Sequence, residues 1–344
     1  MIWHPLTLCL WLLDLSTWMV YLSAAGRILA GLPGWQPGVS DRRQLWREFR
    51  LELAGLQGRW ILALQSFALL VFITVIAIVW PIYVPGAMCG KGVLQAMGSP
   101  GYQAVFLRIA AVGCIWGWHA VSTMDADDPQ GRLTALCARL LLLVGPLLFA
   151  ADLTVGRGLV AIRPDHPVSC CSAIYDQTAV FGELSPVIAG LTPGVWMVGC
   201  VCGWIVVCCW GFYQWRRPRL LTPAVCLLMS GLSFCWMVTA VLALKFGFTS
   251  YIYEILSHPC LWCLFLVDHH MLGFLLFGLL GWAAFATLSS AISVILAVRY
   301  GHLGDIAGRR VKRAGCHLFL ASLMFMVIAA GPALLWRMRF GGWL

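Results

Sequence analysis

The sequence predicts an all-α protein, a polytopic membrane helix bundle of about eight spans that forms one integral membrane domain over residues 1–344. Three observations lead to this prediction. Hydrophobic residues make up 61% of the chain, whereas a soluble domain has roughly 45–50%. Charged residues make up 11%, against about 25% in soluble domains. The apolar residues also form long runs without the strand-type alternation of a transmembrane barrel. Soluble enzymes, nucleic-acid-binding domains and secreted disulfide scaffolds are therefore excluded.

Each predicted span is an apolar stretch of at least the roughly 17–25 residues that a helix needs to cross a bilayer. In chain order the stretches are 5–30, 60–84, 102–122, 133–155, 191–213, 221–244, 264–298 and 316–336. Turn-forming residues separate them, namely Pro81, Pro85, Gly86, Pro129, Gly131, Pro218 and Pro259. The sequence shows no internal repeat, so an inverted-repeat transporter is not favoured.

Basic residues in the loops indicate the orientation, because cytoplasmic loops carry an excess of Lys and Arg. The odd-numbered loops hold fourteen, namely Arg42, Arg43, Arg47, Arg50, Arg59, Arg132, Arg216, Arg217, Arg219, Arg299, Arg309, Arg310, Lys312 and Arg313. The other side holds six, namely Lys91, Arg157, Arg163, Lys245, Arg337 and Arg339. We therefore expect both termini to be extracytoplasmic. The net charge of +9 then reflects topology and contact with anionic lipid, and no nucleic-acid partner is expected.

The first cytoplasmic loop has a helical pattern of its own. Leu45, Phe49 and Leu53 fall on one face at helical spacing, and arginines occupy the other faces. This pattern predicts an interfacial helix over 40–59 that lies on the inner leaflet. A loop helix packed on the bundle is the alternative.

Five of the fifteen cysteines lie in the outward loops, the side on which a bacterial envelope or an endomembrane lumen is oxidising. Cys89 is in the first of these loops, Cys170 and Cys171 are adjacent in the second, and Cys260 and Cys263 are in the third. Because five is odd, at least one of these thiols must be free, metal-bound or paired with another molecule.

Cys260 and Cys263 form a CxxC motif where we expect a helix to begin. Such a pair can be redox-active, because a helix N-terminus stabilises a thiolate. It can also bind a soft metal, or it can be a structural staple. Cys170 and Cys171 would form a strained and labile disulfide with each other, or static bridges elsewhere. In the redox interpretation the CxxC is the primary pair, Cys170 and Cys171 exchange with it, and Cys89 is a resolving thiol.

An acid and two histidines follow the CxxC motif, namely Asp268, His269 and His270. Ionisable groups in a span are functional candidates, and on a helix His270 would share a face with Cys263, where a quinone ring or a metal could lie. The apolar stretch is about 35 residues, or roughly 52 Å as a helix, longer than a bilayer core of about 30 Å. The alternative is therefore that this segment lies at the membrane surface.

The remaining polar and sulfur-containing residues of the spans have a structural default. Asp14, His119 and Asp152 are each expected to pair with a neighbouring helix, and buried cysteines to pack as small hydrophobes. A soft-metal interpretation instead uses His166 and His258 with the outward cysteines and histidines to capture copper. Cys202 and Cys209, seven residues apart on one face of the fifth span, would pass it on.

The run His258-Pro259-Cys260-Leu261-Trp262-Cys263-Leu264-Phe265 resembles the active-site region of quinone-linked membrane thiol oxidoreductases. These are the disulfide-generating proteins of bacterial inner membranes and the vitamin K epoxide reductases. The resemblance implies that Cys260 and Cys263 face a quinone. It also implies that Cys170 and Cys171 shuttle electrons to a thioredoxin-like extracytoplasmic partner. Those families have four core spans and separated shuttle cysteines, and Cys89 has no counterpart in them.

Three functions from different classes follow. The first is thiol–disulfide electron transfer at the extracytoplasmic face. The loops are too small for a soluble catalytic domain, so the chemistry must occur at the outer face or inside the bundle. The second is a copper carrier or insertion factor. The third is a non-catalytic subunit of a larger membrane complex, with static disulfides. In each case the expected location is a bacterial inner membrane, with the cysteine-bearing loops facing the periplasm.

Overall fold

The computed structural model describes residues 1–36, 38–39, 41–128, 131–163, 165–168, 192–217, 222–254 and 260–343. Within these ranges the chain is helical, and eight helices are long and apolar enough to cross a membrane. The predicted all-α membrane bundle is confirmed to that extent. An even number of spans places both chain ends at the same end of the bundle. Accordingly, His4 contacts Tyr83, which follows α2, and Trp343 contacts Tyr251 of α9.

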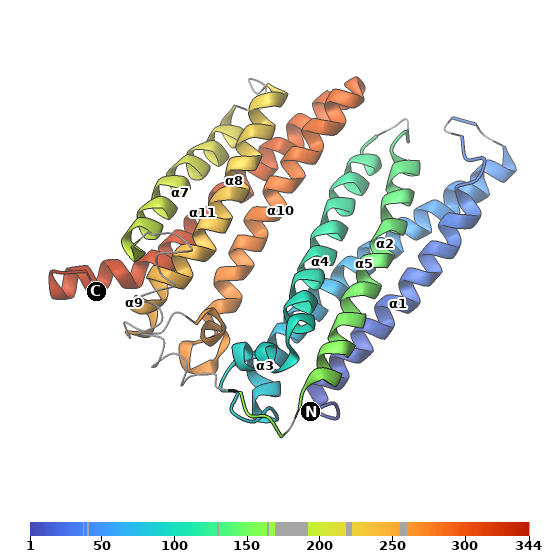
Figure 1. Cartoon of the computed structure of the whole chain (residues 1–344). Helices are drawn as coiled ribbons and strands as arrows, with labels where there is room; N and C mark the ends of the chain where they lie inside the picture. Colours follow the sequence, from blue (N-terminus) through green and yellow to red (C-terminus); the bar gives the residue numbers. More distant parts are fainter. Residues whose placement is uncertain are drawn as a thin grey trace.

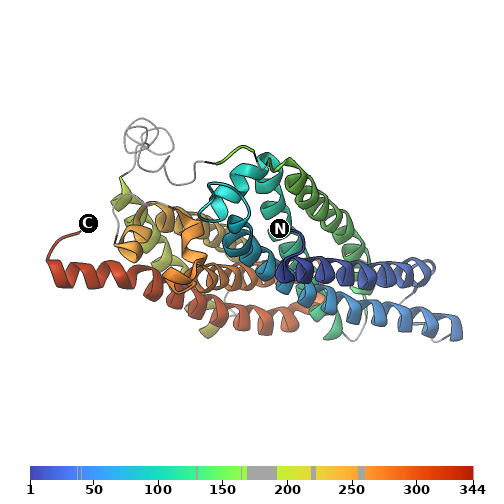
Figure 2. The same cartoon turned by 90° about the horizontal axis from the view of Figure 1, so that it is seen from below.

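The spans form two groups of four that lie side by side (Figures 1 and 2). The first half contains α1 (Pro5–Gly31), α2 (Arg42–Thr74), α4 (Ser99–Ala126) and α5 (Thr134–Ala161). The second half contains α7 (Pro193–Arg216), α8 (Pro223–Ala243), α10 (Leu272–Arg299) and α11 (Gly304–Phe340).

The order of elements is the same in the two halves. In each half the second span ends in a five-residue π-helix, η1 (Val75–Val79) or η4 (Leu244–Phe248). Short helical segments follow before the third span. They are η2 (Trp80–Ile82) and α3 (Gly90–Met97) in the first half, and α9 (Thr249–Tyr253), η5 (Leu261–Phe265) and η6 (Val267–His269) in the second. The architecture is therefore repeated in parallel, although the sequence does not reveal it.

Three predicted boundaries are wrong. The helix expected over 40–59 is not separate, because α2 runs without a break from Arg42 into the second span. With η1 and η2 it forms a 41-residue unit, roughly 60 Å long at 1.5 Å per residue, which no bilayer core covers. The stretch expected to be helical from 264 becomes α10 only at Leu272, and α11 begins at Gly304 rather than at 316. Apolar composition marks the membrane-embedded part of a helix and not its ends.

A buried ion network joins three helices of the first half. The Arg108 guanidinium of α4 donates to Asp14 of α1, with Nη1 3.0 Å from Oδ1, and to Asp152 of α5, with Nη2 3.0 Å from Oδ1. Trp18 also donates to Asp152, at 2.8 Å. Both aspartates thus pair with a neighbouring helix, as expected. Arg108 is only 2% exposed, so the charges depend on one another for solvation.

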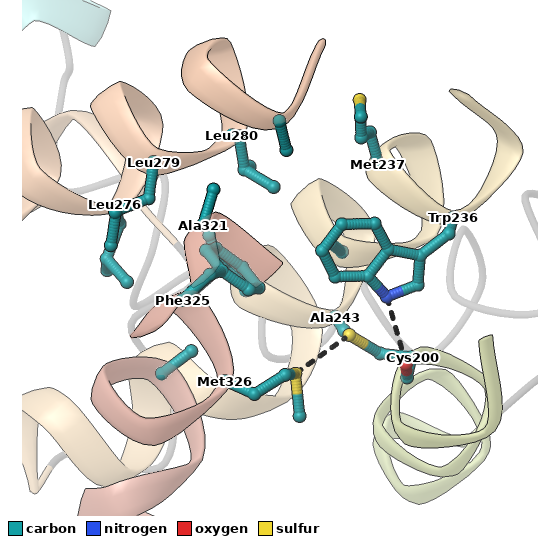
Figure 3. Close-up of a cluster of buried hydrophobic side chains, with 14 of the residues drawn as sticks. Cys200, Trp236, Met237, Ala243, Leu276, Leu279, Leu280, Ala321, Phe325 and Met326 are labelled. Carbon is teal, nitrogen blue, oxygen red and sulfur yellow. Dashed lines mark hydrogen bonds between the residues drawn. The ribbon is translucent and has the colours of Figure 1, made fainter. Parts of the chain in front are cut away.

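The core of the second half is apolar and rich in sulfur (Figure 3). Trp236 of α8 donates to the carbonyl of Cys200 on α7 at 3.1 Å, and the Cys200 sulfur lies 3.8 Å from that of Met326 on α11. At the nearby crossing of α7 and α11, a Cβ at Gly315 would lie 2.7 Å from the Gly211 carbonyl. Glycine therefore permits the close approach of these helices, and Cys200 is a packing residue.

The two halves meet along α4 and α10. Trp116 of α4 packs edge-on against Phe285 of α10, with ring centroids 4.7 Å apart, and the His119 ring stacks on the same phenylalanine. At the arginine-rich end of the bundle, Arg310 of α11 donates to the Thr123 hydroxyl and to Asp127. These contacts hold α4 against α10 and α11 and so join the two halves.

Replacing Arg108 by Met should destabilise the protein strongly, because buried Asp14 and half-buried Asp152 lose their only cation among the described residues. Breaking a buried pair from one side costs about 3–5 kcal/mol. The measurement is thermal unfolding of the purified protein in detergent. Arg139→Met, at an exposed position of α5, is the control. Equal melting temperatures for the two variants would contradict the structural role assigned to this network.

Candidate functional site

Three of the five predicted outward cysteines come together at the end of the bundle opposite the arginine-rich end. The sulfurs of Cys89, Cys260 and Cys263 all lie within 4.8 Å of one another, and those of Cys89 and Cys260 are 3.7 Å apart. Cys89 belongs to the connection between α2 and α4, whereas the other two belong to the connection between α9 and α10. Each half of the molecule therefore contributes to this three-cysteine cluster.

Two of the cysteines precede helical turns. Cys89 is the N-cap of α3, and Cys260 is the N-cap of the 3₁₀ turns of η5, which contain Cys263. The backbone N–H of Cys263 donates to the Cys260 carbonyl at 3.3 Å. The Tyr253 hydroxyl donates to the same carbonyl at 2.8 Å. The CxxC segment thus folds back on α9 and holds both of its sulfurs on one side.

Close packing between the two connections sets the distance between the sulfurs. A Cβ at Gly90 would lie 2.5 Å from the ring of Trp262, so only glycine admits this ring beside Cys89. Phe265 fits against Gly273 in the same way, since a Cβ there would lie 2.8 Å from its ring. The contact of Trp262 with Gly90 therefore holds the CxxC motif beside Cys89.

The three thiols are shielded from water. Cys89 is 1% exposed, Cys260 5% and Cys263 6%. Burial by itself raises the pKa of a thiol, because it disfavours the charged form. At Cys260 other effects outweigh it. Hydrogen bonds from the thiols of Cys263 and Cys89, with backbone N–H groups of Cys263 and Trp262, hold the pKa of Cys260 far below its usual range. Of the three thiols, Cys260 is therefore the one whose thiolate form is stabilised, which is the property that a nucleophilic cysteine needs.

The spacing of the sulfurs also suits a soft metal ion. A metal about 2.3 Å from each thiolate holds the sulfurs about 3.8–4.0 Å apart, which the 3.7 Å separation of Cys89 and Cys260 approaches. Among the described residues, this is the one group of three or more His, Cys, Asp and Glu side chains arranged to hold a metal. Three thiolates are a soft ligand set that selects Cu(I) or Zn(II) over harder ions.

The acid and histidines after the CxxC motif do not join the cluster as a helix would place them. Residues 264–271 form 3₁₀ turns followed by two residues of positive φ, His270 and Met271. They are not a continuous α-helix, so Cys263 and His270 do not share a helical face. Asp268 and His270 are exposed. His269 packs instead against Tyr253, with ring centroids 4.3 Å apart. The helix expected to start at 264 is therefore wrong over these residues, whereas the alternative, that the segment lies at the membrane surface, stays a prediction.

The remaining predicted site residues are either outside the described part of the chain or away from the cluster. Cys170, Cys171 and His258 lie outside the described residues. His166 is exposed, beside Asp165. Cys202 and Cys209 are exposed on α7, so the described structure gives no support to a metal path through the fifth span.

Sequence reasoning missed Gly90 and Tyr253, which position the cysteines. The Gly90-Lys91-Gly92 run directly after Cys89 was an available signal of close packing. No comparable signal marked Tyr253, because its contact depends on how the chain folds back after α9.

The pH dependence of alkylation should identify the nucleophile. An ordinary thiol has a pKa of about 8.5, so below it the reaction rate falls roughly tenfold per pH unit. Because the pKa of Cys260 is lowered, its thiolate persists at lower pH, and its rate should stay constant from about pH 6 to 8. The measurement is iodoacetamide modification of the reduced protein, read by peptide mass spectrometry.

Cys263→Ala and Cys89→Ala should restore a falling rate at low pH, because each removes a hydrogen bond to the thiolate. Cys114→Ala, at an exposed position of α4, should leave the profile unchanged. A wild-type rate that falls tenfold per pH unit would disprove the assignment of Cys260 as a stabilised thiolate.

The comparisons with known proteins add no further constraint. No protein-family model, no curated protein and no solved structure matches this chain. The functional interpretation therefore depends on the geometry of Cys89, Cys260 and Cys263.

Proposed function

We propose that this protein is a membrane thiol–disulfide oxidoreductase that works at the extracytoplasmic end of its helix bundle. The observation that carries the proposal is the three-cysteine cluster. It contains a stabilised thiolate, Cys260, with two further thiols within 4.8 Å of it. A structural staple needs only two cysteines and no thiolate. Three thiols allow a disulfide to move from one pair to another without leaving the site.

The chemistry is a two-electron exchange. A dithiol substrate reduces the Cys260–Cys263 disulfide, so one S–S bond breaks in the cluster and one forms in the substrate. Two electrons and two protons pass to the cluster. While the Cys260–Cys263 disulfide is intact, the Cys89 thiolate, whose sulfur is 3.7 Å from that of Cys260, can attack Cys260. A Cys89–Cys260 bond then forms, the bond to Cys263 breaks, and Cys263 leaves as a thiolate, with no net change in oxidation state. Reoxidation of the dithiol returns the two electrons and two protons to an acceptor.

A lipid-soluble quinone suits the role of acceptor, because it takes up two electrons and two protons to become a quinol. The cluster lies where α2 and α8 end and α4 and α10 begin, at the boundary that a quinone in the bilayer can reach. Trp262 and Phe265, with ring centroids 5.7 Å apart, supply aromatic surface in the same turns. Phe265 is buried and Trp262 is half-buried, so Trp262 is the ring of this pair on which a flat, apolar acceptor would stack.

A thioredoxin-like protein suits the role of donor, with Cys170 and Cys171 as the shuttle pair. The described chain before these cysteines ends at Val168, whose N–H donates to the Pro85 carbonyl at 2.9 Å. Pro85 is four residues before Cys89. The second outward loop thus starts beside the loop of the cluster. With the arginine-rich end in the cytoplasm of a bacterial inner membrane, both loops face the oxidising periplasm.

Soft-metal binding is the second candidate, and the spacing of the three sulfurs favours it. In that case the three thiolates hold one Cu(I) or Zn(II), and the protein carries or delivers the ion. The ligand set would be Cys89, Cys260 and Cys263. The soft-metal interpretation of the sequence also used histidines. Of these, the structure describes His166, His269 and His270, and none of them is part of the sulfur cluster.

Thiol labelling in isolated membranes tests the proposal. Two of the three cluster thiols should be protected from a maleimide reagent when the quinone pool is oxidised, and should become reactive when it is reduced. Cys263→Ser should abolish this response and the oxidation of a dithiol substrate, because Cys260 loses the partner of its disulfide. Cys114→Ser should behave as the wild type.

Two other outcomes would overturn the redox proposal. Protection that depends on copper or zinc, with one ion per chain lost in Cys260→Ser, would establish the metal site. Protection that resists mild reductant and ignores the quinone pool would indicate static disulfides, as expected of a non-catalytic subunit.

A further inference from the structure

A second candidate site lies at the arginine-rich end of the second half, far from the cysteines. An open cavity of about 1060 Å³ lies where α7 and α10 end and α8 and α11 begin. Its volume is at the upper limit of ordinary ligand pockets, roughly 300–1,000 Å³. A cavity between four helix ends lies at the level of the lipid headgroups and not in the hydrocarbon core.

The lining of this cavity is basic. Arg216 and Arg217 contribute from the end of α7, and Arg309 and Lys312 contribute from the first turns of α11, against a single acid, Asp305. Among the described residues, none of the four cations forms an ion pair. The Arg216 guanidinium lies over the ring of Trp215, 4.8 Å from its centroid, so it is held in place without neutralising its charge. Four such cations together favour the binding of an anion in the cavity.

The other wall of the cavity is apolar. Val294 and Val298 of α10 line it together with Val311 of α11. Val311 and Val294 are buried, whereas Val298 is exposed on the helix surface. A site with cations on one side and aliphatic side chains on the other suits an amphipathic ligand whose anionic group lies beside its hydrocarbon chains.

The corresponding position of the first half has the opposite charge. A cavity of about 640 Å³ lies there between the ends of α1 and α4 and the beginnings of α2 and α5. Four acids line it, namely Glu48, Glu52, Asp125 and Asp128, with Arg59 as the one cation. The two halves repeat the same helices, so the basic lining is specific to the second half and is not a general property of this end.

From this arrangement we infer that the second-half cavity binds an anionic phospholipid, with the phosphate between the cations of α7 and α11 and the acyl chains along α10. The shared chemistry is a phosphate group, which a lipid or free phosphate could supply. The apolar wall favours the lipid. The site is independent of the cysteine cluster and of the function proposed for it.

The test uses the full-length protein in nanodiscs of phosphatidylcholine with or without phosphatidylglycerol. Native mass spectrometry counts the lipid molecules retained, and thermal unfolding measures their effect. The cavity variant combines Arg216→Gln, Arg309→Gln and Lys312→Gln. The control variant removes equal charge at the same end of the first half, with Arg42→Gln, Arg43→Gln and Arg50→Gln, all at exposed positions.

Wild type and control should retain phosphatidylglycerol and melt at a higher temperature in its presence. The cavity variant should retain it at least about tenfold less well and lose the shift. Equal losses in both variants would mean non-specific attraction to surface charge. Retention by the cavity variant would also overturn the inference. The inference would also be wrong if inorganic phosphate alone, added to the wild type in detergent, raised the melting temperature as much as phosphatidylglycerol does. The site would then bind free phosphate.

Discussion

The contact between α4 and α10 is the interaction on which the candidate site depends. Each four-helix half carries part of the cysteine cluster, and neither half has more than two of its thiols. The aromatic contact of Trp116 with Phe285 joins the spans, and Trp262 seated on Gly90 joins the connections that precede them. A site built in this way exists only in the assembled bundle. The CxxC motif that first indicated it is, by contrast, local in the sequence.

The bilayer imposes a second constraint, because a charge within it must be paired. In the first half Arg108 satisfies two aspartates from two other helices. The second half has no ion pair within its own described residues. It packs through sulfur, aromatic and glycine contacts, as around Cys200 (Figure 3). Two halves with the same order of helices are thus stabilised by different chemistry, which is one reason why their sequences do not look repeated.

The two ends of the bundle also differ in the kind of charge that they carry. At one end, hydrogen bonds to Cys260 lower the pKa of a buried thiol and so favour its thiolate form, although burial opposes it. At the other end, cations around the second-half cavity stay exposed and without carboxylate partners. The first arrangement favours reaction or metal binding at a protected atom, whereas the second favours attraction of an anionic group from the membrane.

The sequence by itself determined the class of protein and the eight spans, because hydrocarbon accepts only long apolar helices whose backbone groups are bonded internally. It also identified the cysteines of the cluster, since their position in loops at one end of the bundle follows from the spans. It failed at the boundaries of 40–59 and 264–298, where apolar composition does not mark the end of a helix, and it misplaced His270. Only the tertiary structure decided that Cys89 joins the CxxC pair and that Cys202 and Cys209 do not. That choice depends on which helices pack together and on single contacts such as Gly90 with Trp262, which no spacing along the chain encodes.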